Sequence, residues 1–332
     1  MRAASDFVIG PTYASAPECF VHPGVPSGRI HAFVMTSCDS NIYPGIRRLE
    51  NDITQRRDGF GNRIAALEQE QSFAAPYRRT VWVYVPHGYV TGTLAPFMVV
   101  QDGHAYLNSL PVVLDNLIAA RRVPAMVAIL VDSGGGDAQG SQRGLEYDTL
   151  SGRYSDFIET EVLPRVETET GVRLTSDPDG RATMGVSSGA ACAFTMAWFH
   201  PERYRRVLSY SGTYVNQQSP PNCDFPRGAW EYHATLIPGT ARKPLRIWLE
   251  VGERDLHVED PEETWHNWPL ANQRMAAVLA AKAYAYRFTL SLGGRHFDPR
   301  VLEQTLPGAL AWLWEGYQGD DGTVTRSHEI FC

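Results

Sequence analysis

Cysteine is scarce in this chain, which has five cysteines among 332 residues, at positions 19, 38, 192, 223 and 332. No two of them form a C-x-x-C pair, so the common zinc-ribbon and dithiol redox motifs are excluded. An odd number leaves at least one cysteine unpaired within a monomer. We interpret Cys192, in an apolar stretch, as a small buried residue, whereas Cys19 and Cys38 are candidates for a disulfide if the protein is exported.

Long hydrophobic runs are also lacking, and none approaches the roughly 20 residues that a helix needs to cross a bilayer. Membrane insertion is therefore not expected. The first seven residues lack the apolar core of a signal peptide. A mature protein that begins after a removed signal would look the same, so the sequence leaves localisation open, and secretion or residence in the periplasm is compatible with it.

Positive charge is not in excess, because 30 Lys and Arg residues stand against 37 Asp and Glu residues, a formal net charge of -7. The basic residues are dispersed rather than clustered, which argues against a nucleic-acid partner. The glycine cluster at 133–140 lacks the G-x-G-x-x-G spacing and the Lys-Ser/Thr of a phosphate-binding loop. We interpret it as a loop after a buried strand at 125–132, where it borders a site at the carboxyl edge of a sheet. An uncharged small molecule is the expected partner.

The chain does have the composition of a globular protein, with 43% hydrophobic and 20% charged residues. Its length fits one enlarged α/β domain spanning residues 1–332. Apolar or alternating runs predict strands that are separated by helical patterns at 190–199 and 301–314. The expected strands cover 28–37, 81–85, 96–101, 125–132, 181–184, 245–251 and 286–290.

The most informative motif is Gly185-Val186-Ser187-Ser188-Gly189, which follows a short apolar run and precedes a helical pattern of small residues. This context is typical of a nucleophile elbow, a strained turn that exposes a serine. The flanking glycines remove Cβ atoms that would collide with the adjoining strand and helix. Ser187 is the candidate nucleophile, and the amide of Ser188 at the helix start is a candidate oxyanion donor. The alternative is a flexible connector between strand and helix.

The order serine, acid, histidine is that of an α/β-hydrolase, with each residue on a loop beyond a strand's carboxyl end. Asp255 follows the expected strand at 245–251, and we predict that it orients the base. Glu253 and Asp260 are nearby competitors. His296 follows the last expected strand in a glycine-bearing loop and is the candidate general base. The second oxyanion donor is expected after the strand at 96–101, at Gly103 and His104, although an Asp-Gly turn there has a simple structural explanation as well.

Taken together, these segments resemble the esterase D-like α/β-hydrolases, the group that includes enterochelin esterases, feruloyl esterases and related carbohydrate esterases. The resemblance runs from about residue 79 to residue 314. It rests on the segments 81–89, 101–103, 185–189, 200–204, 207–212 and 294–296. It implies an α/β-hydrolase fold, a mostly parallel central sheet of about eight strands with helices on both faces. It also implies Ser187, Asp255 and His296 as the triad, in agreement with the interpretation from the residues.

Other parts of the chain extend or depart from this pattern. Arg143 and Glu146 resemble a pair that such enzymes place near the active-site entrance, and an ion pair that braces a loop is the structural alternative. Residues 47–73 look inserted between the first two expected strands, and an active-site rim, a subunit contact and a polar surface excursion all remain open. The segment 213–243 stands where these folds insert a lid, and its aromatic residues Tyr214, Trp230 and Tyr232 are candidates for substrate binding.

We therefore predict a serine carboxylic ester hydrolase that works through an acyl-enzyme and needs no metal or cofactor. Its expected substrates are aryl or feruloyl-type, sugar-linked or siderophore esters, and the acyl and alcohol groups stay undetermined. Two alternatives remain: an acyltransferase that uses the same triad, and a non-catalytic binding protein on this fold. The sequence also leaves the oligomeric state open, including a homo-oligomer.

Overall fold

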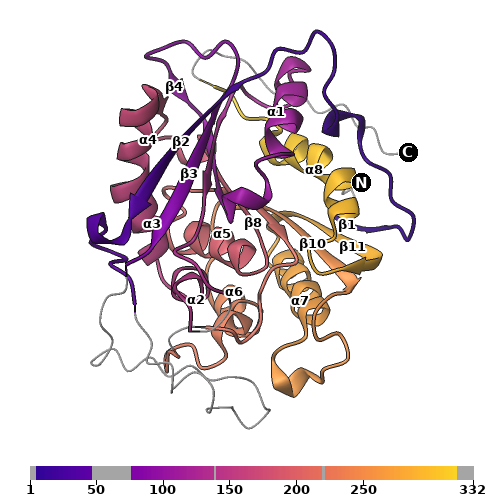
Figure 1. Cartoon of the computed structure of the whole chain (residues 1–332). Coiled ribbons are helices and arrows are strands. Elements are labelled where there is room, and N and C mark those ends of the chain that lie inside the picture. The colour runs from indigo at the N-terminus through magenta and orange to yellow at the C-terminus, as the bar shows by residue number, and fades with distance from the viewer. Residues whose placement is uncertain (1–4, 47–75, 138–139, 219–220, 320–332) are drawn as a thin grey trace.

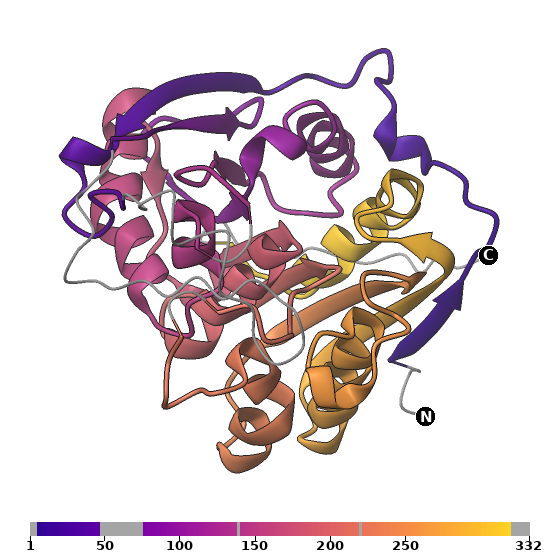
Figure 2. The ribbon, with the colours of Figure 1, turned by 60° about the horizontal axis from the view of Figure 1, so that its bottom comes forward.

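The computed structural model describes residues 5–46, 76–137, 140–218 and 221–319. The predicted insertion at 47–73 lies outside these described residues, so its role stays a prediction. Within them, a twisted sheet runs through the centre of the molecule and helices cover both of its faces (Figures 1 and 2). None of the helices in these ranges is long and apolar enough to cross a bilayer.

The central sheet has nine strands in the order β1-β11-β10-β9-β8-β5-β6-β3-β2. All neighbouring strands pair in parallel from β1 to β6, whereas β3 runs antiparallel to both β6 and β2. A separate short pair, β4 (Leu94–Ala95) and β7 (Arg173–Leu174), lies outside it. The bounds of the nine strands are β1 Asp6–Ile9, β2 Arg29–Thr36, β3 Arg78–Val85, β5 Phe97–Gln101, β6 Val127–Val131, β8 Arg181–Val186, β9 Arg206–Tyr210, β10 Arg246–Arg254 and β11 Ala285–Arg295.

We expected about eight strands and placed seven of them in the sequence. The two strands of the central sheet that we did not place are β9 and β1, and β1 lies at the edge beside β11. This strand is only four residues long, and Val8 is 63% exposed. A short edge strand with one face in solvent carries little of the hydrophobic periodicity that marks a strand in the sequence. β1 is therefore defined by its pairing with β11 rather than by its own pattern.

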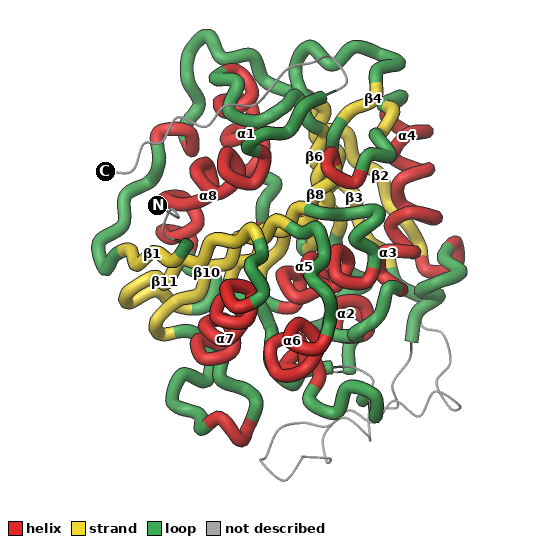
Figure 3. The backbone as a smooth tube through the Cα atoms, turned by 180° about the vertical axis from the view of Figure 1, so that it is seen from behind, coloured by secondary structure: helices red, strands yellow, loops and turns green. Residues whose placement is uncertain are grey.

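Helices cover the two faces unequally (Figure 3). One face of the sheet packs against α1 (Leu110–Ala119) and α8 (Pro299–Trp314). The other face carries the remaining helices. These are α2 (Gln142–Tyr147), α3 (Arg153–Phe157), α4 (Leu163–Thr170), α5 (Ser188–Phe199), α6 (Ile237–Gly239) and α7 (Trp268–Ala281).

Both faces are buried because the central strands are apolar on both sides. In β5, Phe97 and Val99 face the larger helical layer, while Met98 and Val100 face α1 and α8. Every residue of β5, β6, β8 and β9 is buried, as expected of strands in a parallel sheet with two helical layers. The chain leaves the parallel strands at one common edge, and the candidate functional residues follow these carboxyl ends.

Candidate active site

Ser187 lies between β8 and α5 in a strained conformation, with φ 57° and ψ -128°. Its amide donates to the Tyr210 carbonyl at 3.0 Å, and its own carbonyl accepts the Thr213 amide at 3.1 Å. The flanking glycines are required by close packing, since a Cβ on Gly185 would lie 2.3 Å from the carbonyl carbon of Gly189. The strand–serine–helix geometry is thus that of a nucleophile elbow, as the sequence predicted.

The hydroxyl of Ser187 lies 3.3 Å from the Thr213 hydroxyl. Thr213 is buried and lies just after the end of β9. β9 pairs with β8, the strand that Ser187 directly follows. The serine itself is half-buried. Sequence reasoning missed Thr213 because a threonine after a Ser-Gly turn carries no chemical signature of its own.

Asp255 and His296 come together although they are 41 residues apart. His296 Nδ1 lies 2.6 Å from Asp255 Oδ1, an oxygen that also accepts the Leu256 amide at 2.6 Å. Because an ionised carboxylate only accepts hydrogen bonds, this contact assigns the donor role to Nδ1. The Asp255 side chain is fully buried, whereas that of His296 is 24% exposed. The edge of the Trp268 ring packs against the imidazole, with centroids 6.2 Å apart.

The pair of Asp255 and His296 lies near the end of β9, the neighbour of the strand β8 that Ser187 follows. The Phe297 amide donates to the Ser211 hydroxyl at 3.4 Å, and Ser211 directly follows β9, which pairs with β8. Within the described residues no hydrogen bond joins Ser187 to His296, and the serine hydroxyl contacts Thr213 instead. Such contacts often tighten only when substrate binds.

The backbone amides of the three candidate oxyanion donors, Ser188, Gly103 and His104, differ in whether they already donate a hydrogen bond. Ser188 and Gly103 are the first residues of helical turns, so their amides have no acceptor within those turns. The His104 amide instead donates to Asp132 Oδ1 at 3.0 Å, and its Nδ1 lies 2.8 Å from the same oxygen. Because that amide is already occupied, we keep Ser188 and Gly103 as candidate donors and withdraw His104.

Arg143 and Glu146 do not pair with each other. Arg143 binds both carboxylate oxygens of Asp102, with Nη2 2.7 Å from Oδ2 and Nε 3.0 Å from Oδ1. Glu146 is fully buried and binds Arg79 through both oxygens, at 2.6 and 2.9 Å. The expected pairing of Arg143 with Glu146, at an active-site entrance or as a loop brace, is therefore wrong, and the buried Glu146 cannot reach a substrate. Arg143 braces Asp102, the left-handed residue that begins the Gly103 turn.

The three aromatic residues of segment 213–243 are also core residues rather than pocket residues. Tyr214, Trp230 and Tyr232 are at most 1% exposed. The Tyr214 hydroxyl donates to Ser209 Oγ at 2.9 Å, and the Tyr232 hydroxyl lies 2.7 Å from Thr195 Oγ1. Their burial contradicts the predicted contact with substrate, because rings packed against α5 and the sheet pin this segment to the body of the protein.

A buried acid that the sequence did not single out lies behind the elbow. Asp148 is 3% exposed, and its Oδ2 accepts Gln217 Nε2 at 3.3 Å. Gln217 also donates to Ser188 Oγ at 3.2 Å. Burial raises the pKa of Asp148 to about 7. This network fixes the first residue of α5, whose amide is a candidate oxyanion donor.

The remaining candidates for special chemistry are the cysteines. Cys19, Cys38, Cys192 and Cys223 are all free thiols, so the proposed bridge between Cys19 and Cys38 is not present. Cys192 is buried in α5, as the sequence predicted. Cys332 lies outside the described residues.

Residues 72–313 match the protein family described as "Putative esterase". The chain belongs to this esterase family. The match covers every strand from β3 to β11 and both turns that carry the candidate serine and histidine. The fold of the chain is accordingly that of the α/β-hydrolases, as predicted from the sequence.

Individual relatives agree with the family assignment. The esterase is similar to the iron(III) enterobactin esterase of Dickeya dadantii (strain 3937), with 24% identity over 254 residues, 72% of this chain and 52% of the relative. It thus spans about half the length of the curated relative that it matches. The solved enterochelin esterase from Shigella flexneri is 26% identical over 71% of this chain and 55% of that one, with a TM-score of 0.55. A ferulic acid esterase from Anaeromyces mucronatus shares the fold, with 12% identity, coverage of 91% and 95%, and a TM-score of 0.55.

Proposed function

We propose that the protein is a serine carboxylic ester hydrolase with Ser187 as nucleophile, His296 as general base and Asp255 as the residue that orients the base. The observation that carries this proposal is the 2.6 Å contact between His296 Nδ1 and the buried Asp255 carboxylate, on the strand ends beside the strained Ser187. A strained serine and an oriented imidazole are the two groups that acyl transfer requires.

The mechanism that we propose is two-step acyl transfer. His296 Nε2 accepts the proton of Ser187 while Oγ attacks the ester carbonyl, and the amides of Ser188 and Gly103 bind the resulting oxyanion. The tetrahedral intermediate then collapses to an acyl-enzyme, and His296 returns its proton to the leaving alcohol. In the second half, His296 activates water, which releases the acid and regenerates the Ser187 hydroxyl.

The substrate class that we propose comes from the relatives. Their names refer to enterobactin, a siderophore, and to ferulic acid, an aromatic acid. We therefore propose aryl or feruloyl-type, sugar-linked or siderophore esters as substrates of this chain. The absence of a basic surplus in the sequence fits a neutral ester better than a polyanion.

Fluorophosphonate labelling and turnover of p-nitrophenyl acetate test the proposal. The parent chain is expected to be labelled at Ser187, and Ser187→Ala is expected to lose labelling and to lower turnover by about 10³-fold or more while the circular dichroism spectrum stays unchanged. Near-parental turnover in this variant would refute the assignment. A folded parent chain that neither reacts with the probe nor hydrolyses the ester would favour a binding protein, and transfer of the acyl group to added glycerol would favour a transferase.

A further inference from the structure

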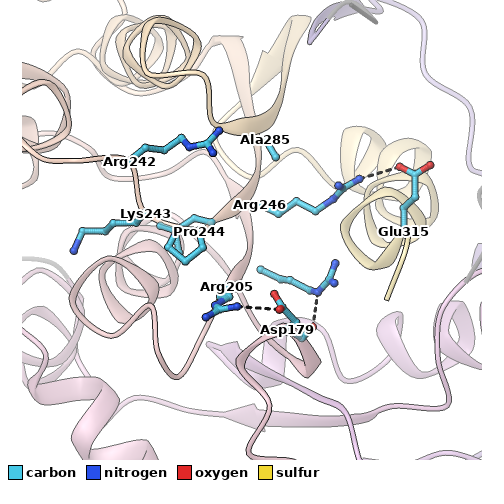
Figure 4. A pocket seen from close by; sticks show the side chains of 10 residues that line it. Asp179, Arg205, Arg242, Lys243, Pro244, Arg246, Ala285 and Glu315 are labelled. Atoms are coloured by element: carbon cyan, nitrogen blue, oxygen red, sulfur yellow. Dashed lines mark hydrogen bonds and ion pairs between the residues drawn. The ribbon is translucent and has the colours of Figure 1, made fainter. Parts of the chain in front are cut away.

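A cavity of about 300 Å³ lies at the amino ends of β9, β10 and β11, and Figure 4 shows its lining side chains. Ser187 follows the carboxyl end of β8, so the cavity lies at the opposite edge of the sheet. Its wall contains five cationic side chains and two carboxylates, Asp179 and Glu315. The cations are Arg205, Arg206, Arg242, Lys243 and Arg246. Since β10 has nine residues at about 3.3 Å each, this cavity is roughly 26 Å from the Asp255 end of the strand. It is therefore separate from the candidate active site.

Two of the arginines occupy paired positions on adjacent strands. Arg206, the first residue of β9, is the register partner of Arg246, the first residue of β10. Register partners on parallel strands point to the same face, so two like charges are held side by side. Burial and the neighbouring Arg246 lower the pKa of Arg206 to about 10. The fold therefore keeps two mutually repelling cations next to each other in the wall of the cavity.

The two carboxylates of the cavity wall form ion pairs with Arg246 and Arg205. Arg246 Nη2 lies 2.9 Å from Glu315 Oε2, and Arg205 Nη1 lies 2.9 Å from Asp179 Oδ2. Dashed lines mark these two ion pairs in Figure 4. Arg206 is 7% exposed and, within the described residues, has no ion pair. Its guanidinium donates to the backbone carbonyls of Asp179 and Leu313 and lies over the Trp314 and Tyr317 rings, 5.3 and 5.6 Å from their centroids.

One structural role of the arginines is to cap α8. Leu313 and Trp312 are in the last turn of that helix, and their carbonyls accept from Arg206 and Arg246. A helix carboxyl end supplies only about half a negative charge, so it does not balance the cluster.

The remaining two cations also lack carboxylate partners in the described part of the chain. Arg242 is exposed and donates to the Ala283 carbonyl at 2.8 Å. The Lys243 ammonium lies over the Trp198 ring, 4.7 Å from its centroid. Five cations against two carboxylates leave three positive charges at one cavity of a protein whose formal net charge is -7. The positive charge at this cavity is therefore opposite in sign to the net charge of the whole chain.

We propose that this cavity binds a small anion that carries a phosphate group, either inorganic phosphate or a phosphate monoester. A guanidinium presents a planar fork that matches two phosphate oxygens, and a dianion offsets most of the surplus charge. The volume is at the lower end of the range for small-molecule pockets, so it accommodates phosphate together with a short organic group. The bound anion bridges the starts of β9 and β10 and thereby stabilises the folded state.

Isothermal titration calorimetry of the full chain tests the proposal, with inorganic phosphate and glycerol 3-phosphate titrated separately at constant ionic strength. We expect saturable binding at one site per chain, at least about tenfold weaker in Arg242→Gln, whose exposed side chain is not needed for folding. Arg206→Gln removes the buried cation and is expected to lose binding altogether. Tighter binding of the monoester than of phosphate identifies the organic group as part of the ligand.

The matched control is Arg29→Gln, an exposed arginine on the distant edge strand β2. It is expected to bind as the parent chain does, and Arg242→Gln and Arg29→Gln are expected to retain parental ester turnover, which shows that they are folded. Circular dichroism checks the fold of Arg206→Gln, because Arg206 is buried and donates to the end of α8. The proposal is overturned if the parent chain shows no saturable heat up to about 10 mM phosphate, or if Arg242→Gln and Arg29→Gln bind equally well. Neither result bears on the proposed esterase activity, which has its own test at Ser187.

Discussion

Gly252 of β10 packs against Gly294 of β11 so closely that a Cβ on Gly252 would lie 2.5 Å from the Gly294 carbonyl oxygen. The register of the two strands shifts just beyond Gly252, and Arg254 then pairs with Arg295. The residues that follow these two arginines are Asp255 and His296. We infer that the contact between the two glycines sets the spacing at which the acid meets the imidazole.

Gly252→Ala tests this relationship. The added methyl group has to displace backbone, so we expect a loss of about 1–3 kcal/mol in the free energy of unfolding and at least a tenfold lower ester turnover. The control is Gly308→Ala in α8, where a Cβ meets nothing within 4 Å and alanine favours the helix by up to about 1 kcal/mol. Denaturant unfolding and p-nitrophenyl acetate turnover check both variants. Parental turnover in Gly252→Ala would contradict the proposed role of the contact.

If Asp255 orients the base as proposed, Asp255→Asn is expected to lower kcat by about 10³- to 10⁴-fold, as loss of the orienting acid does in Ser-His-Asp enzymes. An amide at this position no longer fixes the proton on His296 Nδ1. The matched control is Asp260→Asn, since Asp260 Oδ2 lies 2.8 Å from His257 Nδ1 in a nearby but exposed pair. This control should keep its activity within about twofold. Equal losses in the two variants would remove Asp255 from the proposed triad.

The ion pair between Arg79 and Glu146 predicts a large change in stability. Both side chains are buried, so Glu146→Gln leaves the Arg79 charge without its counterion, and we expect a loss of about 3–5 kcal/mol in the free energy of unfolding. Glu169→Gln breaks the surface pair with Arg165, whose side chains are each 41% exposed, and should cost about 0.5 kcal/mol or less. Urea titrations measure both values, and similar costs would show that burial does not decide the effect.

Glu250 predicts a pH dependence of stability. It lies fully buried in β10, accepts the Ser291 hydroxyl at 2.8 Å, and burial raises its pKa from 4.5 to about 8. Between these two pH values the folded state holds a proton that the unfolded state has lost, so this group's contribution to stability falls as pH rises from about 4.5 to about 8.

Glu250→Gln removes that titration and keeps an acceptor for Ser291. We expect the variant to match the parent near the acid end of this window and to be more stable above its upper end, so that its stability curve is flatter. The surface variant Glu259→Gln serves as the control and should follow the parent curve. Denaturant titrations across the range measure this, and parallel curves for Glu250→Gln and the parent would be the contradicting result.

The elements with strong local patterns were predictable. The strand before Ser187, the glycine pair around it and the small-residue helix after it form one continuous segment, so residues close in sequence carry the whole elbow. The edge strand β1 was not predictable, because four half-exposed residues have no pattern that distinguishes them from a loop. Its strand conformation depends on hydrogen bonds to β11.

Aromatic residues in segment 213–243 show where sequence reasoning fails. A tyrosine that lines a pocket and one that pins a loop to the core have the same neighbours in sequence. Tyr214 and Tyr232 take the second role because their hydroxyls find Ser209 and Thr195, residues that belong to β9 and α5. Asp148 and Gln217 were overlooked for the same reason, since only folding brings them to Ser188.

The amino-acid sequence by itself determined the α/β class, the family and the three candidate residues in their chain order, because local periodicity and short glycine-bearing turns encode them. Tertiary structure alone decided that Asp255 reaches His296, that Glu146 pairs with Arg79 rather than with Arg143, and that five cations meet at one cavity. Side-chain contacts between distant segments depend on strand register and on burial, and neither of these is written in any single stretch of the chain.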